Sequence, residues 1–271
     1  MPIHDRFARI GCVLLAAMTA AIGLFSIVTG DFAYTWQPVP ETLPFREIAA
    51  RAVGLVLVIA SGLFLAPSTT RRGLFVLTAL FAAWLVLLHV PRLGENWLGF
   101  FEFLLPLGAC LALIGLSALD AESKPLSSRL TPAQLILAGR VIFGVGLIGC
   151  GASHFVYGEL AAQMIPAWIP GRSFFTYLTG AGHIAAGASL MSGILLRLST
   201  ALLCFMLACF VLLLHVPRVL ADPTSRYEWT MMFVAMLFNG AAWLIAAAVR
   251  APIGAYRTQA ELRKGATATA A

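Results

Sequence analysis

Long apolar stretches separated by short polar segments dominate the pattern along the chain. Each stretch has about 17 to 22 residues, the length of helix that crosses about 30 Å of hydrocarbon. Because backbone polar groups in lipid must be hydrogen-bonded within their own segment, each stretch predicts a transmembrane helix. The pattern therefore predicts an all-α polytopic membrane protein with eight spans, at residues 10–29, 50–66, 73–90, 98–119, 135–153, 174–193, 198–215 and 229–249.

One short phrase occurs twice. Residues 87–92 and 213–218 both read Leu-Leu-His-Val-Pro-Arg, and each copy ends a long apolar run. Thirteen residues after each histidine, at Glu102 and Glu228, the chain has a glutamate. Self-similarity at a fixed offset is typical of a duplicated unit. Four spans per half is an even number, so both halves cross in the same direction, as parallel repeats related by an axis along the membrane normal.

The polar segments divide the chain into four parts. We predict a first four-helix repeat at 1–119, a cytoplasmic linker at 120–131, a second four-helix repeat at 132–250 and a cytoplasmic tail at 251–271. The linker is the most polar stretch in the interior of the sequence, which is why we place it outside the membrane.

The basic residues are distributed unevenly across the predicted membrane. Hydrophobic residues make up 60% of the chain and charged residues 11%, with a net charge of +6. If Met1 lies in the cytoplasm, twelve of the eighteen Lys and Arg residues lie on the cytoplasmic side. The positive-inside rule then places both termini in the cytoplasm, and we predict a bacterial inner (plasma) membrane protein. The expected partner of this charge is the lipid bilayer and not a nucleic acid.

The two halves differ in their polar residues. The segment 153–157 has His154 where the matching segment 30–34 has Asp31, and His183 lies about ten residues inside its predicted span. The second helix of the first half has no histidine, so the second half is the predicted functional copy. Both segments lead into loops with prolines and a tryptophan, Trp36 or Trp168, which we expect along the outer membrane surface.

Ionisable residues inside membrane spans are costly to bury and usually mark function. The predicted catalytic residues are in the second half, and the predicted cofactor-binding residues come mainly from the first half. We expect the histidine and the glutamate of each repeat to face one another. No residues are assigned as metal ligands. The catalytic set is His154, His183, His215 and Glu228, and the cofactor-binding set is His89, Arg92, Glu102 and Arg218.

Three classes of function fit these residues. The first is a redox site near the outer surface, where a His or Glu hydrogen-bonded to the carbonyl of a quinone passes protons as the ring is reduced; histidine-ligated haem or a metal ion is the variant. The second is a proton-coupled path for a small solute or ion. The third is a non-catalytic subunit that docks another protein. The five cysteines include no C-x-x-C pair, so disulfide-forming redox chemistry is not supported.

The second half carries three linked motifs. Its first helix ends in Gly-x-x-His-Phe at 151–155, the following loop reads Pro-x-Trp-Ile-Pro at 166–170, and Tyr-Leu-Thr-Gly at 177–180 opens a glycine-rich helix. This set resembles the DoxX family of four-helix membrane proteins over about residues 138–250, and the first half resembles it only through the internal repeat. The resemblance implies a membrane oxidoreductase, or its membrane subunit with a soluble or membrane redox partner, since relatives are associated with thiosulfate:quinone oxidoreduction or with oxidative-stress complexes. Of the site residues, it carries over only His154, because family members usually have an acidic residue where this chain has His183.

Overall fold

The computed structural model describes residues 5–120 and 130–251, and these residues are mostly helical. The main helices are α1 (Arg6–Thr29), α2 (Arg46–Leu65), α3 (Thr70–Trp84), α4 (Trp97–Asp120), α5 (Pro132–Val156), α7 (Arg172–Ser192), α8 (Leu196–Cys209) and α10 (Arg226–Ala248). Shorter helical segments are η1 (Tyr34–Trp36), η2 (Leu85–His89), η3 (Val90–Arg92), α6 (Gly158–Met164), η4 (Phe210–His215) and α9 (Val216–Ala221).

All eight predicted apolar stretches lie in helices, and seven helices of the described residues are long and apolar enough to cross a membrane. Two of the seven are composite, since α3 continues through η2 and η3, and α8 continues through η4 and α9. Helix α7 is long enough but is not among the seven. His183 and several Ser, Thr and Gly residues make it more polar than the others. The chain is therefore a multi-pass helical protein suited to a bilayer.

The ends of several helices follow from local sequence signals. The Asp5 carboxylate accepts a hydrogen bond from the amide of Phe7 at the start of α1. At the start of α5, Thr131 and Gln134 bond to each other's backbone amides as a capping box, and Pro132 takes the first helical position. These side chains satisfy amides that have no partner within the helix, which explains why the helices begin there.

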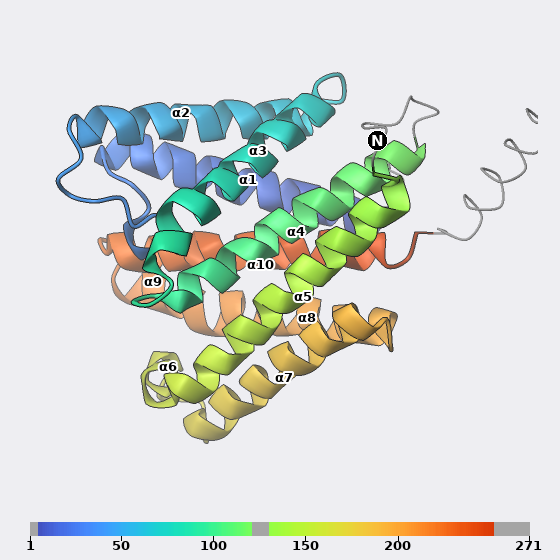
Figure 1. Cartoon of the computed structure of the whole chain (residues 1–271). Coiled ribbons are helices and arrows are strands. Elements are labelled where there is room, and N and C mark those ends of the chain that lie inside the picture. Colours follow the sequence, from blue (N-terminus) through green and yellow to red (C-terminus); the bar gives the residue numbers. More distant parts are fainter. Residues whose placement is uncertain (1–4, 121–129, 252–271) are drawn as a thin grey trace, which may run out of the picture.

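Two extensive contacts between helices join the two halves of the chain, and that of α4 with α5 is the most extensive of all. Helix α4 lies along α5, and α1 lies along α10, with α10 also against α4 (Figure 1). Within the first half α1 packs on α2, α2 on α3 and α3 on α4, while in the second half α5 packs on α7, α7 on α8 and α8 on α10. The same sequence of packing partners therefore occurs twice.

Glycines allow equivalent helices to cross closely in both halves. A Cβ atom on Gly23 of α1 would lie 2.6 Å from the carbonyl oxygen of Gly54 in α2. A Cβ atom on Gly151 of α5 would lie 2.7 Å from the carbonyl oxygen of Gly180 in α7. No side chain fits at these positions, because the opposing atom belongs to the backbone. The crossings set the register of each helix pair.

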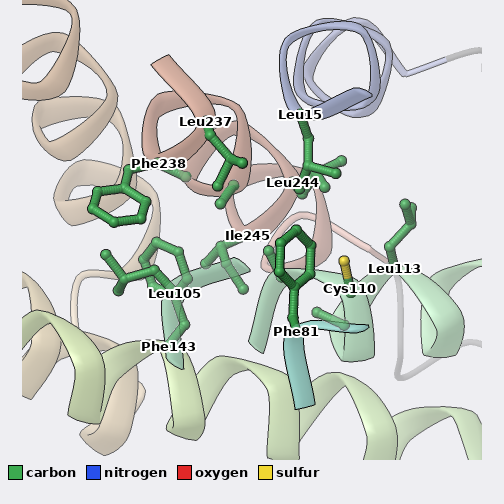
Figure 2. Packing of buried hydrophobic residues seen from close by; sticks show 14 of the residues in the cluster. Leu15, Phe81, Leu105, Cys110, Leu113, Phe143, Leu237, Phe238, Leu244 and Ile245 are labelled. Carbon is green, nitrogen blue, oxygen red and sulfur yellow. The ribbon is translucent and has the colours of Figure 1, made fainter. Parts of the chain in front are cut away.

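The buried core spans both halves. Figure 2 shows Leu15 of α1, Phe81 of α3, Phe143 of α5 and Ile245 of α10 converging on residues of α4, and these four side chains are fully buried. In contrast, α1, α2, α7 and α8 expose large apolar side chains such as Val28, Leu202 and Phe205. Such exposure is unusual on a water-facing surface and suits contact with lipid.

Candidate functional site

Both copies of the repeated phrase adopt the same unusual backbone. Residues Leu85–His89 and Phe210–His215 each form a π-helix that ends at the histidine. The amide of Val90 donates to the carbonyl of Leu85, and the amide of Val216 donates to the carbonyl of Val211. A proline follows each turn and is unable to donate to the carbonyl four residues before it, so the preceding turn widens. Such π-turns are frequent at functional sites.

In the first half, His89 is occupied by contacts within the protein. Its Nε2 lies 3.2 Å from the carbonyl oxygen of Trp36, and the side chain is 1% exposed. Since a carbonyl only accepts, Nε2 carries the proton and donates. One face of the ring packs on Phe103 with 4.4 Å between centroids, and Gly99 leaves space for its Nδ1 side.

Trp36 enters the first half from the segment between α1 and α2 and fills the end of the helices next to it. The side chain is 2% exposed and stacks on Phe103 at 4.4 Å. It also meets Phe81 and Trp84 edge-on. The expectation of a surface position is therefore wrong for this side chain, because aromatic burial outweighs its affinity for the membrane interface. Trp168, in the corresponding loop of the second half, is 66% exposed as expected.

The other predicted residues of the first half do not assemble into a site. Arg92 donates to the carbonyl of Leu88 in its own helix at 3.1 Å. Glu102 is half-buried, and within residues 5–120 and 130–251 its carboxyl group has no hydrogen bond or ion pair. The structure does not bring His89 and Glu102 together, since His89 contacts Trp36 and Phe103 instead.

In the second half, Arg218 and Glu228 form a two-point ion pair. Arg218 Nε lies 2.8 Å from Glu228 Oε2, and Arg218 Nη2 lies 2.5 Å from Oε1. Glu228 also lies in the first turn of α10, where the hydroxyl of Ser225 accepts from its amide and the helix dipole favours an anion. Parallel bonds between a guanidinium and a carboxylate fix both groups in orientation.

His215 lies near this pair without bonding to it. Both Glu228 and Arg218 act electrostatically on its ring. The side chain is 9% exposed, and Nδ1 is completely buried with no hydrogen-bond partner among the described residues. A buried polar atom without a partner is costly, and Trp36 Nε1 in the first half also has none among the described residues.

His154 of α5 and His183 of α7 form the second cluster. Their ring centroids lie 5.3 Å apart, and Phe210, the first residue of η4, lies 6.2 Å from His154 and 5.7 Å from His183. The close crossing at Gly151 and Gly180 brings the two helices together here. The sequence places both histidines in one catalytic set but does not predict that they are neighbours. It gives no sign that Phe210 lies beside them.

Both histidines are held by backbone carbonyls. His154 Nδ1 lies 3.1 Å from the carbonyl oxygen of Thr176, and His183 Nδ1 lies 2.9 Å from that of Thr179. Each Nδ1 is therefore the protonated donor, and each neutral ring keeps a lone pair on Nε2. This is also the arrangement that orients histidine ligands of metals, although residues 5–120 and 130–251 contain no group of three or more potential metal ligands.

The structure does not place Asp31 at the position equivalent to His154, with which the sequence aligns it. It lies beyond the end of α1, whereas the glycine crossings place Ser26 opposite the position of His154. Asp31 Oδ1 lies 2.6 Å from Arg46, and Oδ2 lies 3.2 Å from Arg226 at the start of α10. Asp31 thus links the end of α1 to the starts of α2 and α10, and so joins the two halves.

These contacts also make the Asp31 network sensitive to acid. Burial raises the pKa of the Asp31 carboxyl, but the Phe32 amide and the Arg226 and Arg46 guanidinium groups outweigh it and hold the pKa below its ordinary value of 3.8. A lowered pKa gives stability that is complete above the ordinary value and is lost as the pH falls through the folded-state value. We expect Asp31→Asn to cost about 1 kcal/mol near neutral pH.

The check is a comparison of unfolding free energies from neutral pH to below pH 4. The difference between wild type and Asp31→Asn is expected to stay constant down to about pH 5 and then to shrink. Glu47→Gln, which removes an exposed ion pair with Arg51, is the control. A difference that grows on acidification contradicts the assignment.

No family model, curated protein or solved structure matches the chain.

The structure thus separates the sequence-predicted residues into three groups. His154 and His183 are neighbours, His215 lies beside the Arg218–Glu228 pair, and the first-half residues are used in packing or stay apart. The backbone carbonyls that hold the histidines were not readable from side-chain patterns.

Proposed function

We propose that the chain is a DoxX-like inner-membrane protein with eight transmembrane helices in two parallel four-helix repeats and both termini in the cytoplasm. Three observations support the repeats: the identical six-residue phrase, the π-helix at each copy, and the matched glycine crossings of α1 with α2 and of α5 with α7. In this arrangement α7 is the eighth span, and its buried polar residues Thr176 and His183 face neighbouring helices instead of lipid.

We further propose quinone-linked redox chemistry near the outer leaflet, carried by the second half. The observation that carries this proposal is the pair of adjacent imidazoles, His154 and His183, each fixed through Nδ1 so that Nε2 is free to accept a proton. A quinol head group supplies two electrons and two hydroxyl protons, and the residues present fit it because Phe210 offers an aromatic face beside two nitrogen acceptors.

In this mechanism His154 and His183 act as the bases. Each Nε2 accepts one hydroxyl proton, while the carbonyl of Thr176 or Thr179 holds the Nδ1 proton and keeps the ring in place. The Arg218–Glu228 ion pair holds two charged groups in fixed positions at the outer end of the site. The two electrons pass to a soluble or membrane redox partner on the outer side. The chain is then the membrane subunit of a quinone-dependent oxidoreductase.

The test is native mass spectrometry of the full chain in nanodiscs, with a short-chain benzoquinol added. Bound quinol is expected in the wild type and in His89→Ala, and at least tenfold less in His154→Ala and His183→Ala. Analysis of the same samples for metal ions and haem tests these two alternative cofactors. A protein that binds no quinol in several mild preparations would falsify the redox proposal.

Proton-coupled transport of a small solute or ion is the second candidate, and one observation favours it. Glu102, in the fourth predicted span, has no hydrogen bond or ion pair in the described part of the chain, as is typical of a carboxyl group that binds and releases protons. Proton flux into liposomes that is abolished by Glu102→Gln but unaffected by His183→Ala would support this function over the quinone-linked one.

A further inference from the structure

Trp36 contacts two first-half residues whose repeat equivalents belong to the two clusters of the second half. The Trp36 ring lies 6.2 Å from Trp84, and the Trp36 carbonyl accepts from His89. The repeat offset of 126 residues relates Trp84 to Phe210 and His89 to His215. Phe210 contacts His154 and His183, so the position equivalent to Trp36 borders the two clusters at once.

The helix register supports this equivalence independently of the repeated phrase. The crossing of Gly23 with Gly54 matches that of Gly151 with Gly180. Counting from these glycines, Ser26 and Leu57 stand where the second half has His154 and His183, and both are buried. The first half thus has small or apolar residues and an inserted indole where the second half has imidazoles.

Within the described second half, no tryptophan takes the place of Trp36, since the ring contacts of Phe210 are with His154 and His183 alone. The corresponding loop residue, Trp168, is 66% exposed. His215 has no hydrogen bond on either ring nitrogen within the described residues, although His89 bonds to a carbonyl through Nε2. His215 is nine-tenths buried and lies beside the Arg218–Glu228 pair.

We infer that the second half contains a binding subsite, bordered by Phe210, His215 and the His154–His183 pair, for a planar aromatic compound that bears a carbonyl oxygen. The ring of the ligand takes the place of the Trp36 indole, and its oxygen accepts from Nε2 of His215 as the Trp36 carbonyl accepts from His89. This inference rests on the proposed quinone function for the identity of the natural ligand, since a quinone has both features, but the subsite itself is defined by the internal repeat.

The subsite is tested by counting bound molecules by native mass spectrometry on the full chain in nanodiscs. The probes are fluorenone, a planar aryl ketone that serves as a redox-inactive mimic, and the short-chain benzoquinol used to test the proposed function. The wild type is expected to bind one molecule of either probe, and His215→Ala at least tenfold less. His89→Ala, the matched change in the other repeat, is expected to keep one molecule, because Trp36 still fills that position.

Trp36→Ala gives a second, independent measurement. Removing the indole opens the equivalent space in the first half, so this variant is expected to bind two fluorenone molecules, and Trp36→Ala combined with His215→Ala is expected to bind one. If Trp36→Ala does not fold, the His215→Ala and His89→Ala pair still decides the question. Equal binding by these two variants, or no fluorenone bound to the wild type, overturns the inference.

The outcomes separate this inference from the proposed function. Binding of fluorenone that depends on His215, without binding of benzoquinol, supports the subsite and contradicts the quinone function. Binding of benzoquinol that is lost in His154→Ala and His183→Ala but kept in His215→Ala supports the quinone function and contradicts the subsite.

Discussion

Trp36→Ala is expected to lower the free energy of unfolding by about 3–5 kcal/mol, the largest stability effect of any single change proposed for this chain. The indole is 2% exposed and packs on three aromatic rings. Its loss removes that buried area and leaves a cavity beside Phe103 that the rigid helices around it fill only in part. The backbone carbonyl that binds His89 also loses its fixed position.

The measurement is denaturant unfolding in mixed micelles, followed by circular dichroism. Trp168→Ala is the matched control, because that side chain is 66% exposed and its loss is expected to change stability by less than about 0.5 kcal/mol. Indole added to Trp36→Ala is expected to restore part of the lost stability by occupying the cavity. Similar losses in the two variants would show that Trp36 does not anchor the loop.

Glu228→Ala is expected to cost about 2–3 kcal/mol. Breaking a buried ion pair leaves the other charge without a partner and typically costs about 3–5 kcal/mol. The Glu228 side chain is 11% exposed and that of Arg218 is 30% exposed. Water therefore hydrates the guanidinium after the pair is broken, which reduces the cost. Glu228→Gln is expected to lose less, because the amide oxygen still accepts one of the two bonds.

The control for the ion pair lies in the first repeat. Arg92→Ala removes a hydrogen bond to the carbonyl of Leu88 and no ion pair, so it is expected to cost about 1 kcal/mol or less. The same unfolding assay applies, with Arg218→Glu combined with Glu228→Arg as a swap expected to recover at least half of the loss. If Arg92→Ala and Glu228→Ala are equally destabilising, the ion pair contributes nothing beyond ordinary surface contacts.

The helices were predictable from the sequence because their signal is local. Each apolar run of sufficient length became a helix, and the ends fell near capping residues such as Asp5 and Thr131. The less apolar character of α7 was also visible in its own residues, since His183 interrupts a run of Gly and Ala. The position, the ends and the polarity of a helix depend mainly on residues close in the sequence and on the surrounding solvent.

The contacts of the site were only partly predictable, because they depend on which helices pack together. Identical phrases gave a histidine bonded to a carbonyl at His89 and a histidine without a partner at His215. The difference arises from Trp36, which is 53 residues from His89 along the chain. Likewise Arg218 meets Glu228 while Arg92 does not meet Glu102, although the spacing is the same. Side-chain spacing carries no information about such distant partners.

The packing of α1 along α10 has a consequence for how the chain is made. Helix α1 leaves the ribosome before α10, so it meets its main partner from the other half only when α10 has been inserted. Until then the face of α1 that carries Gly11, which closes on Gly240, must be covered by lipid or by the insertion machinery. The two halves therefore do not mature one after the other, and a ribosome that stalls before α10 leaves both α1 and α4 without one of their packing partners.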